Sequence, residues 1–317
     1  MRTNVKIVFI LFLIFIFSIM IYLLIGPVSL FSVDEHTMQT ILFQIRIPRL
    51  VLAIIVGSSL SISGIILQAL LQNPLAEPYI LGSSSGAALG VTLSLLIGIK
   101  CIFFPFTSFI FASLSIFLVY NLAKRNKIIS KTNLILSGIV VNAFLSSLVM
   151  LILNLQKEDI STVVFWLMGN LQRTDIFLLK ISGMLMLLIL IITYLFSFDL
   201  NLFTLGEEKA IYVGLNVELR KRLFFILASF LTAIAVSLSG IIGFVGIIIP
   251  HIMRRIVGTD HRILIPLSCF AGSIFLILSD LLARTIISPI ELPVGVITAL
   301  CGGPFFLYIL NKTYTRS

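Results

Sequence analysis

Two of the three histidines of the chain lie in one stretch, IIGFVGIIIPHIMRRIVGTDHR, at residues 241–262. His251 and His261 are of a residue type that ligates zinc and haem iron, so the stretch could hold a metal. A metal site needs several ligands that converge in space, and the sequence offers no third ligand close to these two. The cysteines form no CxxC pair and lie far apart, at Cys101, Cys269 and Cys301. The sequence therefore predicts no metal site.

A structural turn accounts for the same stretch. Pro250 has no amide hydrogen and is expected to interrupt a short helix at about 246–257. Asp260 precedes a helix expected from about residue 263, and its carboxylate can cap the free N–H groups of that helix. We interpret the segment as a shaped cytoplasmic turn, with conformational coupling to a partner protein as the alternative. Its hinge or gate residues would be Pro250, His251, Asp260 and His261.

The elements that carry this turn must lie in a bilayer. Apolar residues make up 59% of the 317 residues and charged residues 11%, with a mean hydropathy of +1.18. A soluble domain of this length cannot bury so much apolar surface. The net charge of +9 would suggest nucleic acid for a soluble protein, but here it fits an excess of basic residues on the cytoplasmic side. We expect a membrane protein with no nucleic-acid partner.

Apolar stretches of about 20 residues predict the membrane-spanning helices. They lie at about 5–25, 49–71, 79–99, 101–121, 133–153, 177–197, 220–239, 263–285 and 293–311, with the shorter segment at 246–257. The chain is therefore expected to be an all-α polytopic membrane protein of about ten transmembrane helices, forming a single domain over residues 1–317. The first apolar run is expected to be a retained helix, because no cleavage site follows it.

The basic residues predict the orientation of these helices. An even number of segments puts both termini on one side of the membrane. Fifteen of the 22 lysines and arginines then lie on the side of the termini. By the positive-inside rule, both termini are expected in the cytoplasm.

Two short segments of the chain resemble each other. LSISGII at 60–66 is similar to VSLSGII at 236–242, and a proline follows ten residues after the glycine of each. Repeated halves are common in transporters, but so short an apolar match also arises by chance, and both explanations for 58–74 and 234–250 stay open. The first copy adds Asn73 and Pro74 to the expected cytoplasmic hinge.

Two kinds of residue pattern are absent from the sequence, and each absence bears on what would drive transport across the membrane. No ionisable residue lies near the middle of an expected span, because Asp280 and Arg284 fall toward an outer end. Proton- or ion-coupled carriers need a buried titratable relay, so a secondary transporter or channel is the less favoured alternative. The chain also lacks a GxxxxGKS/T phosphate loop. If ATP drives transport, a separate subunit binds the ATP and its magnesium, and this chain holds no cofactor.

The longest expected cytoplasmic loop, 199–222, is suited to receive such a subunit. Glu207 and Glu208 fit the positive N-terminal end of a short helix, and Gly214 fits its C-terminal stop. The short helix would offer an apolar surface that a solvated loop does not need, formed by Ala210, Ile211 and Val213. The alternative to docking is an amphipathic helix that lies on lipid headgroups.

Five segments together resemble the FecCD/BtuC-like family of ABC importer permeases, which serve ferric siderophores, haem and cobalamin. They follow the same order as in that family and span nearly the whole chain. They are IRIPRLVLAIIVGSSLSISG (45–64), NPLAEPYILGSSSGA (73–87), LGEEKAIYVGL (205–215), GFVGIIIPHIMRRIVGTDHRILIP (243–266) and SDLLARTIISPIELPVGVITALCGGPFF (279–306).

The resemblance implies a BtuC-like type II ABC importer permease fold. Two such subunits, identical or different, would surround a central pathway in the bacterial cytoplasmic (inner) membrane. Two ATP-binding subunits and an external substrate-binding protein would complete the complex. The chain would be a transport subunit and not an enzyme. Its cargo would be an iron-type chelate, a ferric siderophore or haem, with cobalamin as an alternative, because the external binding protein largely selects it.

The resemblance also implies roles for individual residues. Arg46 and Arg49 match the family's RLPR motif, and Arg284 matches its ADxxAR motif, with Ser279 where the family has alanine. A ring of such arginines at the outer mouth would steer and dock an acidic binding protein. The ATPase-coupling residues would be Leu205, Gly206, Glu207, Glu208, Ala210 and Gly214.

The family lines its pathway partly with the fifth and last helices. We expect Gly302, Gly303 and Pro304 to interrupt the last helix. The pathway candidates in these two helices are Asn142, Ser146, Gly302 and Gly303.

Overall fold

The computed structural model describes residues 2–28, 33–125, 128–155, 160–172 and 175–314, and these are almost entirely helical. The α-helices are α1 Arg2–Leu24, α2 Glu35–Thr40, α3 Ile47–Leu71, α4 Ser83–Leu96, α5 Phe104–Ala123, α6 Lys131–Leu155, α7 Ile160–Leu167, α8 Ile176–Leu195, α9 Ser197–Leu205, α10 Glu207–Tyr212, α11 Val217–Ser239, α12 Val245–Val257, α13 His261–Thr285 and α14 Val294–Tyr314. Short connecting elements are η2 Ile41–Arg46, η3 Pro78–Leu81, η4 Cys101–Phe103 and the antiparallel pair β1 Lys124–Arg125 and β2 Ile128–Ile129.

Seven helical runs of the described chain are long and apolar enough to cross a membrane. They are Lys6–Leu24, Glu35–Leu71, Cys101–Ala123, Lys131–Leu155, Ile176–Leu195, Val217–Ser239 and His261–Thr285. Two shorter apolar helices, Ser83–Leu96 and Val294–Leu307, lie among them. The expectation of an all-α polytopic membrane protein is confirmed, whereas the number of ten spans stays a prediction.

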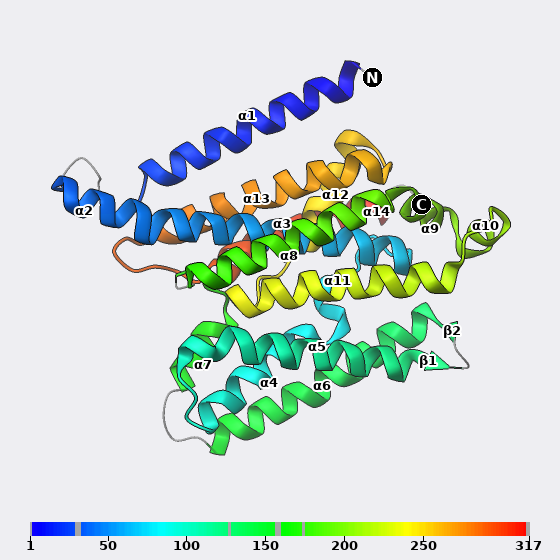
Figure 1. Cartoon of the computed structure of the whole chain (residues 1–317), viewed down its shortest axis with the longest axis horizontal. Helices are drawn as coiled ribbons and strands as arrows, with labels where there is room; N and C mark the ends of the chain where they lie inside the picture. Colours follow the sequence, from blue (N-terminus) through cyan, green and yellow to red (C-terminus); the bar gives the residue numbers. More distant parts are fainter. Residues whose placement is uncertain (1, 29–32, 126–127, 156–159, 173–174, 315–317) are drawn as a thin grey trace.

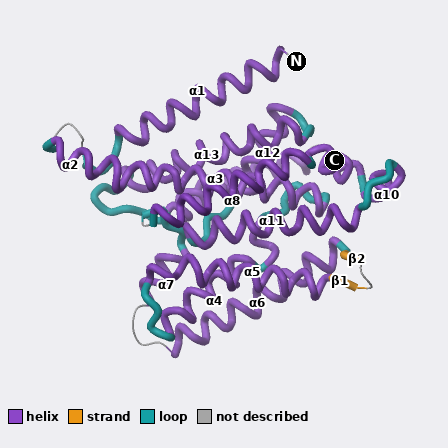
Figure 2. Tube along the Cα trace, in the orientation of Figure 1, coloured by secondary structure: helices purple, strands orange, loops and turns teal. Residues whose placement is uncertain are grey.

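The long helices run along the longest axis of the molecule, with α3 in the middle (Figure 1). The start of α1, the last turns of α14, and α10 lie toward one end of this axis, which we call the α10 end. The α2 helix lies at the other end, which we call the α2 end (Figure 1). The start of α1 and the end of α14 therefore lie toward the same end of the fold (Figure 1). The connection from α13 to α14 is a long loop toward the α2 end (Figure 2).

Small residues let the central helix approach its neighbours. A methyl group at Gly57 would collide with the carbonyl oxygen of Gly272 on α13, and one at Gly64 would collide with that of Gly246 on α12. In lipid, helices associate by such close backbone contacts, because no hydrophobic force drives them together. The two glycines therefore hold α3 against α12 and α13 in the centre of the fold.

The packing of the helices favours a true internal repeat. Helix α3 packs against α12 and α13, while α11 packs against α4 and α5, and α3 and α11 pack against each other. An inverted repeat that relates α3–α6 to α11–α14 would produce this reciprocal pattern. The similarity between 58–74 and 234–250 falls at the ends of the two corresponding helices, which a chance match would not require.

Three local expectations are wrong. Pro250 lies inside the continuous helix α12, and Pro304 lies inside α14, so neither proline interrupts its helix. Pro250 removes the helical hydrogen bond to the carbonyl of Gly246, but Gln68 of α3 donates its Nε2 to that oxygen at 2.9 Å. A neighbouring helix thus satisfies the freed group, as is common in membranes. The expected loop at 199–222 is largely helical, and α11 already begins at Val217.

Candidate functional site

The segment predicted to couple to an ATPase forms a hairpin of two short helices, α9 and α10, at the α10 end (Figure 1). Gly214 follows α10 with φ +87°, a left-handed conformation that suits glycine. The amide of Leu215 donates to the carbonyl of Ala210 at 3.0 Å, and the amide of Gly214 donates to that of Ile211 at 2.8 Å. These bonds close the helix end as expected for a glycine stop. The predicted helix and its stop are confirmed.

The outward face of α10 differs from the prediction in one residue. Ala210 is fully buried, so its expected contribution to the apolar surface is wrong; it lies on the side of α10 that faces α9 and α11. The residues that follow are exposed, with Ile211 at 58%, Tyr212 at 89% and Val213 at 66%. Tyr212 was missed by sequence reasoning, although an aromatic residue between two apolar ones in a polar loop is a usable signal.

Ion pairs attach α10 to two long helices. The carboxylate of Glu207 lies 2.9 Å from Nζ of Lys221 on α11 and 3.3 Å from Nζ of Lys131 at the start of α6. Lys131 also donates to Oε1 of Gln72 at 2.6 Å, and Gln72 donates its Nε2 to the carbonyl of Phe203 in α9 at 2.7 Å. Gln72 ends α3, so one small network joins α9 and α10 to α3, α6 and α11.

A second contact joins α9 to the turn before α13. Oδ1 of Asn201 accepts hydrogen bonds from the amide of His261 at 2.9 Å and from its ring Nδ1 at 2.7 Å. Nδ2 of Asn201 donates to Oδ1 of Asp260 at 2.8 Å. Sequence reasoning missed Asn201, because its partners lie about 60 residues away in the chain.

Local contacts hold the turn that carries the two histidines. Asp260 caps α13 by accepting the amide of Arg262 at 3.0 Å, as predicted. The hydrogen bonds from Asn201 and Arg262 hold the pKa of Asp260 below its usual value. His251 instead packs its ring edge-on against Phe305 of α14. Within the described residues, no three metal-ligating side chains gather.

The other expected hinge residues, Asn73 and Pro74, form the turn that follows α3. Oδ1 of Asn73 accepts the amide of Leu75 at 3.0 Å, and its own amide donates to the carbonyl of Gln68 at 3.2 Å. Both residues therefore shape a turn, and their role in a gate stays a prediction.

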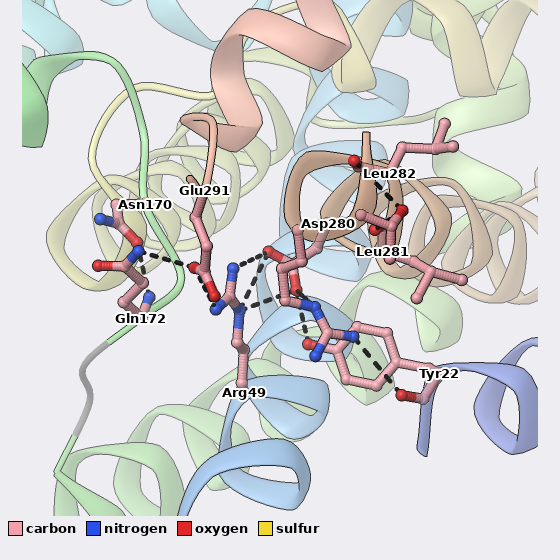
Figure 3. Close-up of polar contacts among 10 residues, drawn as sticks. Tyr22, Arg49, Asn170, Gln172, Asp280, Leu281, Leu282 and Glu291 are labelled. Carbon is pink, nitrogen blue, oxygen red and sulfur yellow. Dashed lines mark hydrogen bonds and ion pairs between the residues drawn. The ribbon is translucent and has the colours of Figure 1, made fainter. Parts of the chain in front are cut away.

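Figure 3 shows a cluster of buried charges that joins the start of α3 to the end of α13. Arg49 of α3 faces Asp280 of α13, with Nη2 2.7 Å from Oδ1, and its Nη1 lies 2.8 Å from Oε2 of Glu291. Tyr22 of α1 donates its hydroxyl to Oδ2 of Asp280 at 2.6 Å. Arg284 stacks on the ring of Tyr22 at 4.1 Å and has Nε 3.5 Å from Asp280. Two arginines and two carboxylates thus neutralise each other where α1, α3 and α13 meet.

Glu291 links this cluster to two connecting segments. It lies in the connection between α13 and α14 and accepts a second hydrogen bond, at 2.7 Å, from Nε2 of Gln172 in the segment after α7 (Figure 3). Burial alone would raise the pKa of Glu291, but the hydrogen bond and charge of Arg49 outweigh it and hold the pKa below its usual value. The carboxylate therefore stays charged at neutral pH.

All three arginines predicted to dock a binding protein are buried in the single chain. Arg46, Arg49 and Arg284 are 2%, 5% and 3% exposed. Arg46 donates to the carbonyls of Leu24 and Val28, where α1 ends. The expected open ring of guanidinium groups is therefore wrong for the single chain. Docking through these arginines stays a prediction, and Arg49 would have to exchange an internal carboxylate for an external one.

The pathway candidates divide into packed and open residues. Asn142 of α6 donates to the carbonyl of Tyr79 at 3.2 Å and accepts from Ser85 at 2.6 Å, so it ties α6 to η3 and α4. Gly302 of α14 packs directly against the ring of Phe244. Ser146 is exposed, and a side chain at Gly303 would meet no neighbour among the described residues.

One buried acid was not anticipated. Glu77, in the connection between α3 and η3, accepts the amide of Phe244 at 3.0 Å, just before α12 begins. Burial raises the pKa of Glu77 above its usual value, and the hydrogen bond from Phe244 offsets only part of this shift. Next to it, the Tyr79 hydroxyl donates to the carbonyl of Ile242 and accepts its amide, each at 3.1 Å. Glu77 and Tyr79 therefore hold the connection before α4 against the connection before α12.

This architecture defines a class of protein. Long apolar helices surround the buried central helix α3. A cluster of buried charges lies at the α2 end. A helical hairpin with an exposed apolar tip lies at the α10 end. Such a chain is a polytopic membrane transport subunit. The model of the FecCD transport family matches residues 5–312. The chain therefore belongs to the FecCD transport family.

Relatives of this chain are named as permease proteins of transport systems. The chain is 38% identical over 288 residues to the cobalamin import system permease protein BtuC of Halobacterium salinarum, covering 90% of this chain and 77% of that protein. It is 36% identical to the hemin transport system permease protein HmuU of Yersinia pestis, covering 88% and 85%. A solved structure, described as an inward-facing conformation of a metal-chelate type ABC transporter, superposes with a TM-score of 0.89 at 34% identity, covering 97% and 99%.

Proposed function

We propose that this chain is the permease subunit of an ABC importer that moves an iron-type chelate into the cell. The cargo class is a ferric siderophore or haem, with cobalamin as the alternative. The names of the two relatives support haem and cobalamin, and the ferric siderophore rests on the sequence resemblance. Two copies, or this chain and a related one, form the pathway. Two ATP-binding subunits hold the ATP and magnesium, and an external binding protein delivers the cargo. Both termini face the cytoplasm of a bacterial cell, at the α10 end.

The α9–α10 hairpin is the observation that supports this function most directly. Its tip exposes Ile211, Tyr212 and Val213, which a solvated loop does not need. Its base is attached to the ends of α3, α6, α11 and α13 through Gln72, Glu207 and Asn201. A push on the tip therefore reaches four long helices at once. In the proposed mechanism, ATP binding and hydrolysis in the partner move this hairpin, and the helical bundles rock to open the pathway alternately to each side.

The charged residues argue against an ATPase-independent secondary transporter or channel. Asp280 is the acid a proton relay would use, but it is already paired with Arg49 and Arg284 and bonded to Tyr22. Protonation of Asp280 in such a relay would remove the only carboxylate paired with Arg284 in the described residues and one of the two paired with Arg49. Glu77 is held by one backbone amide at a turn, and its contacts fit a structural role. Energy from a separate ATPase is the simpler explanation.

The test is uptake of a labelled ferric chelate into vesicles that contain this chain, with and without the ATPase and binding protein. We expect uptake only when ATP and both partners are present. Replacement of Tyr212 by alanine should weaken ATPase binding, since an exposed aromatic anchor at an interface contributes about 2 kcal/mol, roughly a thirtyfold change in affinity. Tyr194→Ala, at an exposed tyrosine on α8, is the matched control.

Two results would count against the proposal. One is uptake driven by a proton or sodium gradient without any ATPase. The other is a Tyr212→Ala variant that binds and couples the ATPase as well as the Tyr194→Ala control does.

A further inference from the structure

A groove of about 690 Å³ runs between α5 and α11 and belongs to none of the sites described above. Its walls are apolar and come from both helices, including Phe109, Leu114 and Phe117 of α5 and Ile226 and Phe230 of α11. Leu114, Phe117, Ile226 and Phe230 are exposed on the single chain. The two helices lie next to each other over much of their length (Figure 1). The groove therefore opens on an apolar outer face.

One end of the groove is polar and positively charged. Lys124, Arg222, Asn121 and Tyr120 line it, where α5 ends and α11 begins. Nε of Arg222 donates to the hydroxyl of Tyr120 at 3.1 Å, which fixes the guanidinium beside the groove. Neither Lys124 nor Arg222 forms an ion pair with an acid in the described part of the chain. Their chain neighbours Arg220 and Lys221, by contrast, are paired with Asp199 and Glu207.

The dimensions match one leaflet of a bilayer. At 1.5 Å per helical residue, the stretch from Phe109 to Lys124 is about 22 Å long. One leaflet of a membrane, with its headgroup region included, is about 20–22 Å thick. An acyl chain in the apolar part would therefore place its phosphate at the level of Lys124 and Arg222. A basic pocket between membrane helices at the cytoplasmic level is a recognised way to bind anionic lipid headgroups.

We propose that the groove between α5 and α11 is a binding site for one anionic phospholipid. The acyl chains occupy the apolar walls, and the phosphate is bound by Lys124 and Arg222, with Asn121 as a further donor. Charge complementarity selects this occupant over a zwitterionic lipid. A second copy of this chain would have to bring an acid into an apolar groove to pair with these cations, and burial of that charge is costly.

The test is lipid retention by the full-length chain, purified from membranes and measured by native mass spectrometry. The probes are phosphatidylglycerol and phosphatidylcholine with identical acyl chains. Each cation close to an anionic headgroup contributes about a fivefold gain in affinity, so Lys124→Gln with Arg222→Gln should reduce the preference for phosphatidylglycerol roughly 25-fold at low salt. Lys100→Gln removes the same charge at the opposite end of α5 and should change nothing.

A second variant tests the apolar part independently. Ser113 lines the middle of the groove, and Ser113→Phe would fill it without touching the cations. We expect this variant to retain less of both lipids. The proposal is overturned if the double variant keeps the wild-type preference, if Ser113→Phe retains lipid as wild type does, or if these changes alter the dimer content of the preparation and leave lipid retention unchanged.

Discussion

Arg49 and Asp280 form a two-pronged ion pair although 231 residues separate them in the chain. Nη2 of the arginine lies 2.7 Å from Oδ1, and Nε lies 2.9 Å from Oδ2. This fork geometry is the strongest that a guanidinium and a carboxylate can adopt. Both side chains are buried, so each charge depends on the other for compensation. The pair fixes α3 against α13 at the end of the fold where a binding protein would arrive.

Loss of the Asp280 charge should therefore destabilise the fold. In Asp280→Asn, Arg49 and Arg284 lose their shared buried counter-charge, and removal of one partner from a buried pair costs about 3–5 kcal/mol. We expect a clear drop in the unfolding temperature of the purified chain in detergent. Asp34→Asn is the control, because Asp34 is an exposed cap at the same end and asparagine also caps helices. Equal stability of both variants would show that the buried cluster does not hold these helices.

Glu291 should compete with a binding protein for Arg49. If docking uses Arg49, then Glu291→Gln removes an internal competitor, and a partly exposed ion pair of up to about 1 kcal/mol corresponds to roughly fivefold tighter capture. Surface-immobilised permease titrated with binding protein measures this. Glu35→Gln, an exposed acid at the same end, is the control. Capture that is unchanged or weaker in Glu291→Gln alone would contradict docking through Arg49.

The same contact predicts a pH dependence. The pKa of Glu291 is lowered in the fold, so the Arg49–Glu291 contact contributes fully above the ordinary pKa of 4.5 and is lost as the pH falls through the lowered value. Wild type and Glu291→Gln should therefore differ in capture from pH 8 down to about pH 5 and converge only below pH 4.5. Convergence already near pH 6 would mean that Glu291 is not held in its charged form by Arg49.

Gly214 should be required for its conformation and not for its small size. It adopts φ +87°, and a side chain there would meet no neighbour among the described residues. Valine is strained in this conformation and should cost on the order of 1 kcal/mol or more, whereas asparagine tolerates it. We expect Gly214→Val to reduce co-purification of the ATPase while the permease stays in the membrane, and Gly214→Asn to retain it. Equal binding by the two variants would remove the conformational argument.

Features that depend only on neighbouring residues in the chain, such as helix positions and helix ends, could be predicted from the sequence. Apolar runs predict where the helices lie, because a bilayer demands them whatever the tertiary packing. Asp260 and Gly214 were identified from their positions at helix ends, since caps and stops need only a few neighbouring backbone groups. Both assignments are confirmed by the hydrogen bonds observed.

The contacts that join distant segments could not be predicted in the same way. The arginines were expected at an open rim, but their burial depends on Asp280 and Tyr22, which other helices supply. Pro250 was expected to break its helix, and the rescue comes from Gln68, about 180 residues earlier in the chain. Ala210 looked available in a loop and is covered only because α10 folds back. In each case a neighbour remote in sequence decides the outcome.

Asn201 provides the last test, because it is the contact that joins the α9–α10 hairpin to α13. Its side chain bonds the amide and ring of His261 and the carboxylate of Asp260. Asn201→Ala would leave the His261 groups, which are buried, without this partner, at a cost of about 1–3 kcal/mol. If the hairpin transmits motion to α13 through this contact, the complete transporter should still hydrolyse ATP but import less chelate for each ATP consumed.

The control for this variant is Asn216→Ala, because Asn216 caps α11 at the same end and bridges to no other helix through its side chain in the described residues. Loss of that cap should lower stability by a similar amount, about 1 kcal/mol, without changing the ratio of import to hydrolysis. Import and ATP hydrolysis are measured together in vesicles that contain the ATPase and binding protein. If both variants lower import and hydrolysis in proportion, Asn201 only stabilises the turn, and the hairpin must act on the pathway through the Glu207–Lys131 pair to α6 instead.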